Sequence, residues 1–251
     1  MLIVERDGPV QRIKLNRPEV RNAINDELIA ELSDEFAALP PEIRVVVLSG
    51  EGKAFCAGGD LQWMRRAAAY TEDENIQDAI RLGMLFEAIA HCRAAVIAQV
   101  HGAAFGGGCG LVAAADIAIA AGGTLFSFSE AKLGLIPATI SQFVIPKIGA
   151  GNARALYVTA EAFDADRALA IGLVHEVHPL EGLGGAVETK VAAILRNGPE
   201  AVDESKKMVL DPPADLPESA KRLALRRASD EGREGVSAFL EKRSASFVVE
   251  R

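Results

Sequence analysis

Two glycine-rich segments constrain the fold of this chain more than any other feature of its sequence. Residues 54–60 read Ala-Phe-Cys-Ala-Gly-Gly-Asp, and residues 101–110 read His-Gly-Ala-Ala-Phe-Gly-Gly-Gly-Cys-Gly. Each segment follows a run of β-branched residues and precedes a helical pattern, so each is predicted to be a strand-to-helix corner. Because glycine has no side chain, its backbone N–H can approach a bound group closely. Two N–H groups that converge from these corners would form an oxyanion hole for a carbonyl that gains negative charge.

Composition excludes several classes of function. The 251 residues are 49% hydrophobic, which is enough for one core and a smaller appendage. The formal charge of -8 argues against broad nucleic-acid binding, which needs a basic surface. Cys56, Cys92 and Cys109 lack CxxC spacing and the N-terminus lacks a signal-peptide pattern, so we expect a cytoplasmic protein with reduced thiols. His175 and His178 would face opposite sides of a strand, and we expect no metal site.

A unit of strand, glycine corner and helix recurs roughly every 50 residues in the first part of the chain. This recurrence predicts stacked β-β-α turns of a spiral, within the α/β class, rather than a doubly wound sheet. The predicted strands are 10–15, 45–48, 96–100, 116–120 and 125–128. The predicted helices begin after Asn25 and cover 73–92 and 107–115.

The pattern changes after about residue 140, where the sequence becomes mostly helical. Residues 141–171 and 185–244 are predicted to be helical, with one short strand at 173–177 between them. We therefore divide the chain into a core, residues 1–192, and a C-terminal helical region, residues 193–251. An apolar face of the last helix would pack on the core or on another subunit.

An oxyanion hole that stabilises an enolate needs a group that moves a proton at carbon. Glu130 is the best candidate, because it follows an apolar strand close to the corners and because the chain has no Gly-x-Ser-x-Gly or HExxH motif. Desolvation at the end of a buried strand would raise its pKa and allow acid-base chemistry near neutral pH. The alternative is that Glu130 is a first-turn helix acid or a salt-bridge partner. Asp60 is predicted to cap a helix that starts at Leu61.

The two glycine segments resemble the signature segments of the enoyl-CoA hydratase/isomerase (crotonase) superfamily. Residues 16–23 resemble its N-terminal CoA-loop segment and residues 234–243 resemble its C-terminal helix, in the same order and at the same spacing. The resemblance implies a crotonase-like spiral of β-β-α repeats with a C-terminal helical trimerisation region. It also implies an acyl-CoA substrate, no separate cofactor, and a homotrimer or a hexamer made of two trimers.

Individual site residues follow from this resemblance. The oxyanion N–H groups fall on Gly59 and Gly107, and one of the two glutamates of the hydratases falls on Glu130. The other glutamate position is Gly110, so the usual acid-base pair is incomplete. The positions implied to contact the substrate or CoA are Arg21, Ala23, Ala57, Gly58, Asp60, Leu61, Gly110 and, from a neighbouring chain, Lys242.

The incomplete pair leaves three interpretations open. One glutamate is enough to move a proton between two carbons, as the resemblance to Δ3,Δ2-enoyl-CoA isomerases implies. Alternatively, Glu130 alone activates water, and the glycine leaves its position open for a larger substrate. A third interpretation is a non-catalytic member of the family that binds acyl-CoA.

Two further segments favour hydration. Residues 61–70 and 129–141 resemble bacterial methylglutaconyl-CoA hydratase-like members, which also carry glycine at the position of Gly110. This resemblance implies a hydro-lyase that acts on a branched or dicarboxylic 2-enoyl-CoA. Arg65 and Arg66 would bind the distal carboxylate of such a substrate, or form a solvated helix face. Trp63 is predicted to be a packing residue near the acyl site.

Overall fold

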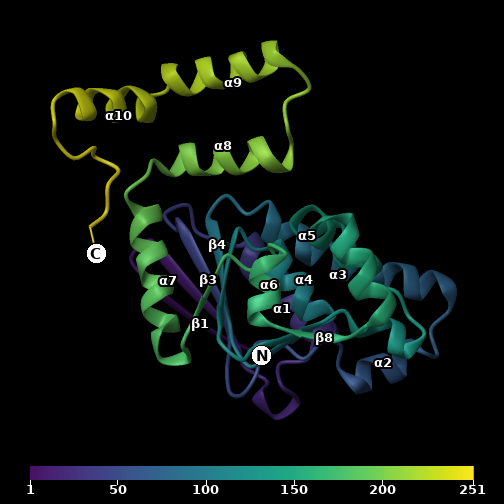
Figure 1. Cartoon of the computed structure of the whole chain (residues 1–251). Coiled ribbons are helices and arrows are strands. Elements are labelled where there is room, and N and C mark those ends of the chain that lie inside the picture. Colours follow the sequence, from purple (N-terminus) through teal and green to yellow (C-terminus); the bar gives the residue numbers. More distant parts are fainter. Residues whose placement is uncertain (251) are drawn as a thin grey trace.

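A six-stranded sheet is the central element of the computed structural model, which describes residues 1–250 (Figure 1). The strand order is β1-β2-β3-β4-β6-β9. β1 pairs antiparallel with β2, and all the other neighbours in this sheet are parallel. The strands are β1 (Leu2–Asp7), β2 (Val10–Leu15), β3 (Val45–Gly50), β4 (Ala95–Val100), β6 (Ile117–Ala121) and β9 (Glu176–His178).

The continuous β-branched run of β3 is buried on both of its faces, as expected for a parallel strand covered by two layers. Val46 and Leu48 point into the main core. Val45 and Val47 point to a second core on the other face, which α7 covers. The helices on the main-core side are α1 (Asp26–Ala37), α3 (Glu72–Ala90), α4 (Gly107–Ala114) and α5 (Ala138–Thr159), whereas α7 spans Leu180–Leu195.

Capping residues set the ends of the helices that support the site. Asn25 accepts a hydrogen bond from the backbone N–H of Leu28 at 2.9 Å and so caps α1, as the sequence predicts. Thr71 and Glu74 form a capping box at the start of α3. α4 begins at Gly107, directly after Gly106, whose φ of 48° requires glycine at the turn. Asp60 caps α2 (Leu61–Ala67), the helix that follows β3, so both predicted strand-to-helix corners are confirmed.

A second, three-stranded sheet in the order β5-β7-β8 belongs to the same spiral. Its strands are β5 (Ala103–Phe105), β7 (Leu125–Ser127) and β8 (Ala162–Asp164). β8 lies within residues that were expected to be helical. Its central residue Phe163 is buried against Phe126, with ring centroids 5.8 Å apart, so tertiary pairing overrides the local pattern. The strand predicted at 173–177 is present as β9, but it begins only at Glu176, because Leu173 and Val174 pack into the main core.

Three C-terminal helices form an arm beyond the core, and the chain then returns beside α7 (Figure 1). They are α8 (Pro199–Leu210), α9 (Leu216–Ala228) and α10 (Asp230–Leu240). α8 and α9 bury none of their residues, and α10 buries only Ala238. The division at residue 192 and the trimerisation role of this region stay predictions. Within residues 1–250, no helix has both the length and the apolar character that crossing a bilayer requires.

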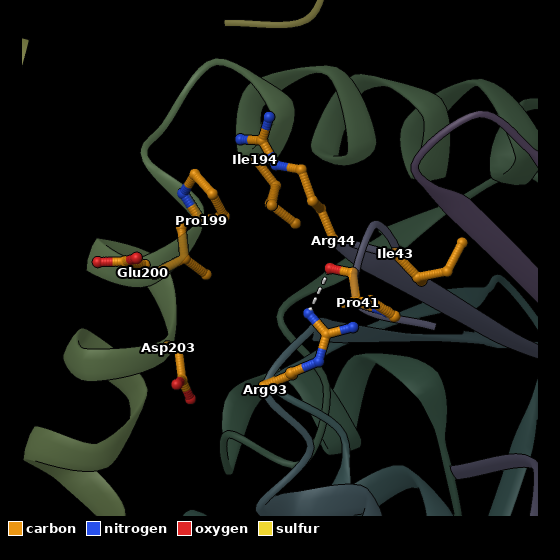
Figure 2. A pocket seen from close by; sticks show the side chains of 9 residues that line it. Pro41, Ile43, Arg44, Arg93, Ile194, Pro199, Glu200 and Asp203 are labelled. Atoms are coloured by element: carbon orange, nitrogen blue, oxygen red, sulfur yellow. Dashed lines mark hydrogen bonds between the residues drawn. The ribbon is translucent and has the colours of Figure 1, made fainter. Parts of the chain in front are cut away.

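One arginine holds both ends of the arm at its base. Arg44 donates from Nη1 to the carbonyl of Phe247 at 2.6 Å, and from Nη2 to the carbonyl of Asn197. A cavity of about 320 Å³ lies beside it, between α8 and the loop before β3. Figure 2 shows Arg93 in this cavity donating to the carbonyl of Pro41 at 2.8 Å. Its lining, as far as residues 1–250 describe it, includes neither glycine segment, so it is separate from the site below.

Candidate active site

The two glycine segments lie against each other through their backbones. The N–H of Cys56 donates to the carbonyl of Ala103 at 3.1 Å, and the N–H of Phe105 donates to the carbonyl of Cys56 at 3.0 Å. A Cβ built on Gly108 would lie 2.4 Å from the backbone oxygen of Cys56, so only glycine permits this approach. The sequence therefore brings two strand-to-helix corners together at one place.

Two backbone N–H groups at this place are free to bind a ligand. The bridge between Ile24 and Gly59 does not use the N–H of Gly59. The N–H of Ile24 donates to the carbonyl of Gly58, and the N–H of Asp60 donates to the carbonyl of Ile24. Gly107 is the first residue of α4, where the N–H has no partner within the helix and the helix end is positively polarised. Among residues 1–250, neither glycine donates its N–H to an acceptor. Both line the same cavity, so the predicted oxyanion hole stays a prediction that this arrangement supports.

The carboxyl group of Glu130 lies beside the second corner. Glu130 is in the short 3-10 helix η2 (Ser129–Leu133), and its Oε1 would be 3.2 Å from a Cβ built on Gly106. Its Oε2 is buried and has no hydrogen-bond partner in the described residues. Burial raises its pKa, as the sequence predicts. Glu130 does stand in the first turn of η2, but it forms no salt bridge with residues 1–250, so its carboxylate is free to accept a proton.

A cavity of about 1010 Å³ joins these groups. Both glycine corners and Glu130 line one part of it, and apolar side chains line most of the rest, as is usual in small-molecule sites. The apolar lining comprises Leu61, Trp63, Met64, Leu82, Leu133, Leu135, Ile136 and Ile140, and the polar side chains are Arg65, Asn75, Asp78, Ser129 and Thr139. Asp78 was not singled out from the sequence, because its position is indistinguishable there from the polar face of α3.

The predicted contact residues divide into two groups. Ala57, Gly58 and Leu61 line the cavity together with Gly59 and Gly107. Asp60 does not line it; its Oδ1 accepts from the backbone N–H of Gln62 at 2.8 Å, and its Oδ2 accepts from Arg17 at 2.8 Å. Asp60 therefore caps the helix α2 (Leu61–Ala67), as the sequence predicts, and anchors the first corner.

The remaining predicted contacts lie outside the cavity. Arg21 is exposed, and its carbonyl accepts from the N–H of Ala57 at 3.0 Å, so it adjoins the first corner. Ala23 is buried, and its carbonyl accepts from Arg17. Lys242 follows α10, and Figure 1 shows α10 far from α2. The contact predicted for Lys242 comes from a neighbouring chain, so it stays a prediction.

Apolar side chains fill the space beside Gly110. A Cβ built there would lie 2.6 Å from Cζ of Phe86 and 2.6 Å from Cγ2 of Ile140. Gly110 is buried and does not line the cavity. The interpretation that this glycine leaves open space for a larger substrate is therefore wrong, because the two apolar side chains occupy that space. No sequence signal links Phe86 or Ile140 to residue 110, since all three meet only through the fold.

The two arginines of α2 have different surroundings. Arg66 binds Asp26 at 2.6 Å across the surface, whereas Arg65 lines the cavity. Trp63 also lines the cavity and packs partly buried against the main core, which confirms its predicted position near the site. Arg65, and not Arg66, is therefore placed to meet a ligand.

Comparisons with known proteins agree with this arrangement. The Enoyl-CoA hydratase/isomerase family model matches residues 5–249. The chain is 33% identical to crotonyl-CoA hydratase of Syntrophomonas wolfei, with 98% of this chain and 97% of that protein covered. It is 31% identical to 2,3-dehydroadipyl-CoA hydratase of Escherichia coli, with 98% of both chains covered.

Solved structures give the same result. AtuE of Pseudomonas aeruginosa is 34% identical and superposes with a TM-score of 0.95 over 99% of both chains. An enoyl-CoA hydratase of Shewanella pealeana is 36% identical, with a TM-score of 0.93 over 98% of this chain and 95% of that one. The chain thus has the crotonase fold and an acyl-CoA substrate, and it belongs to the enoyl-CoA hydratase/isomerase family.

Proposed function

We propose that this enzyme adds water to a 2-enoyl-CoA thioester and that Glu130 is its acid-base group. The observation that carries the proposal is the position of the Glu130 carboxyl, which is beside Gly106 in the cavity that both corners line. Its buried and unpaired Oε2 is suited to take a proton from a bound water. The N–H groups of Gly59 and Gly107 hold the thioester oxygen.

One carboxylate suffices for this reaction. Glu130 takes a proton from water while the oxygen of that water bonds to C3 of the enoyl group. The electron pair of the C2=C3 bond moves to the thioester oxygen, where the two glycine N–H groups stabilise the enolate. Glu130 then returns the proton to C2, so that one molecule of water has been added across the double bond.

We propose a branched or dicarboxylic substrate of the 3-methylglutaconyl-CoA kind. Arg65 lines the cavity and has no ion pair among residues 1–250, so it can bind a distal carboxylate with its planar guanidinium group. The relative named 2,3-dehydroadipyl-CoA hydratase supports this class. The exposed apolar side chains of α10, Val236, Phe239 and Leu240, support assembly as a homotrimer or hexamer.

Glu130→Gln tests the assignment of the acid-base group. We expect kcat to fall about a thousandfold, because general acid-base catalysis contributes a factor of this order. Affinity for a saturated acyl-CoA should change less than about threefold, since the amide keeps the shape of the carboxyl. In the wild-type enzyme, the raised pKa of Glu130 should place the acid limb of kcat/KM above pH 4.5. Near-normal turnover of the variant would exclude Glu130 as the acid-base group.

A substrate panel separates hydration from the alternatives. Crotonyl-CoA, 3-methylglutaconyl-CoA and a 3-enoyl-CoA are incubated in labelled water, and the products are identified by mass. Conversion of the 3-enoyl-CoA without any 3-hydroxyacyl product would favour the isomerase, which the single glutamate motivates. Saturable binding without turnover would indicate the non-catalytic interpretation. Gly110→Glu is not a useful probe, because Phe86 and Ile140 occupy the space its side chain needs.

A further inference from the structure

The indole nitrogen of Trp63 is a buried hydrogen-bond donor with no acceptor in the described residues. Its ring lines the cavity and lies beside the first corner, with Cε3 3.8 Å from a Cβ built on Gly59. We propose that Trp63 is a specificity-determining residue, whose N–H binds an oxygen on the acyl chain of the substrate. This inference rests on the proposed function and names the group that selects within it.

Packing alone does not account for a tryptophan at this position. Buried indole N–H groups usually find an acceptor, because leaving a buried donor unpaired is unfavourable. A phenylalanine would fill an apolar wall without that cost. The cavity contains a second buried polar atom without a partner, Oε2 of Glu130. Both residues line the cavity, so a ligand that enters it can supply the partner that each atom lacks.

The helix that carries Trp63 is able to adjust to a ligand. α2 buries none of its seven residues, and the Asp60 carboxylate binds its N-terminal end through the backbone N–H groups of Gln62 and Trp63. The capped end and the partly buried ring of Trp63 fix this end of α2, whereas the other residues of α2 have no buried anchor. A small displacement of α2 would expose the indole N–H to the acyl chain.

The acceptor is assigned to the acyl chain and not to the thioester. The two glycine N–H groups already meet the thioester oxygen in the proposed mechanism. Beyond them, the walls are apolar, with Leu82, Leu135 and Ile140 among them. An oxygen that enters this part loses its water, so a donor there discriminates strongly in its favour. The indole N–H donates only. Arg65 in the same cavity has no ion pair among residues 1–250, whereas the carboxylate of Asp78 there is already paired with Arg81, so we infer a carboxylate.

Trp63 is the only tryptophan in the chain, so its indole gives a single N–H signal by NMR. The wild-type protein is titrated with glutaryl-CoA and, as the matched control, with butyryl-CoA; neither has a double bond to hydrate. We expect the indole proton to move downfield with glutaryl-CoA and to stay in place with butyryl-CoA. An indole proton that responds equally to both ligands, or to neither, would overturn the proposal.

Two replacements remove the donor while they retain an aromatic ring. Trp63→Phe is the simple variant. Growth of a tryptophan auxotroph on a benzothiophene analogue, which has sulfur in place of the N–H, changes only this residue and nearly preserves its shape. Affinity for glutaryl-CoA should fall about tenfold with either change, and affinity for butyryl-CoA should stay within twofold. Equal losses for both ligands would show a packing role only.

These readouts measure binding and need no turnover. An enzyme that hydrates none of the substrates in the panel would therefore refute the proposed reaction without deciding the role of Trp63. Conversely, an active hydratase whose indole proton ignores the carboxylate would refute the role of Trp63 and leave the reaction in place.

Discussion

The two glycine corners have similar sequences, but the helices that follow them are packed very differently. After the second corner, every residue of α4 beyond Gly107 is buried. After the first corner, α2 buries none of its residues. The cavity between them therefore has one fixed wall, at the start of the buried helix α4, and one adaptable wall, formed by α2.

The proposed roles follow this difference. The fixed wall begins at Gly107, and the carboxyl of Glu130 lies against it beside Gly106. The positions of both groups relative to the reacting carbons must be held within fractions of an ångström. The adaptable wall carries Gly59, Trp63 and Arg65, of which the last two face the variable part of the acyl group. Except for the N–H of Gly59, the groups proposed to act on every substrate thus lie at the packed wall, and selection among acyl chains belongs to the wall that can move.

The largest expected difference between the two walls is in unfolding free energy, and a pair of glycine-to-alanine changes measures it. In Gly108→Ala the new methyl would meet a backbone oxygen at 2.4 Å, which cannot move aside, so we expect a loss of about 3 kcal/mol of unfolding free energy. In Gly59→Ala the nearest atoms are side-chain atoms of Met64 at 3.5 Å, and stability should stay within about 0.5 kcal/mol. Urea unfolding measures both. Equal destabilisation would mean that the two walls are equally rigid.

The features that sequence could predict are those encoded locally. The β-branched run of β3, the caps Asn25 and Asp60, and the place of Glu130 after an apolar strand all depend on residues close in the chain. β8 was missed because three residues hold no periodicity of their own, and its pairing with β7 is a long-range contact. The sequence could not show that the space beside Gly110 is occupied, for the same reason, since Phe86 and Ile140 come from separate helices.

Asp60 attaches the adaptable wall to the core, and its removal is the next largest expected effect. Asp60→Ala takes the cap from α2 and leaves the mostly buried Arg17 without its carboxylate, so we expect a loss of about 2 kcal/mol. Amide hydrogen exchange should accelerate in α2 and stay unchanged in α4. Faster exchange throughout both helices would contradict the division into two walls.

The pH dependence of that loss has a definite sign. Burial would raise the pKa of Asp60, but hydrogen bonds from Arg17, Gln62 and Trp63 outweigh it and lower the pKa. A carboxyl with a lowered pKa contributes its stability above its ordinary pKa of 3.8 and loses it as the pH falls. The difference in unfolding free energy between wild type and Asp60→Ala should therefore shrink below about pH 3.8.

The two arginines of α2 provide the smallest and most specific test of the adaptable wall. Arg65→Ala should raise KM for a 2-enoyl-CoA that carries a carboxylate by about tenfold, because it removes a charged hydrogen-bond donor from the cavity. KM for crotonyl-CoA should change less than twofold. Arg66→Ala is the matched control, since its ion pair with Asp26 is solvent-exposed and contributes at most about 0.5 kcal/mol to stability. A variant at residue 66 that reproduced the selective rise in KM would show that the charge of the helix as a whole, and not one side chain in the cavity, attracts the substrate.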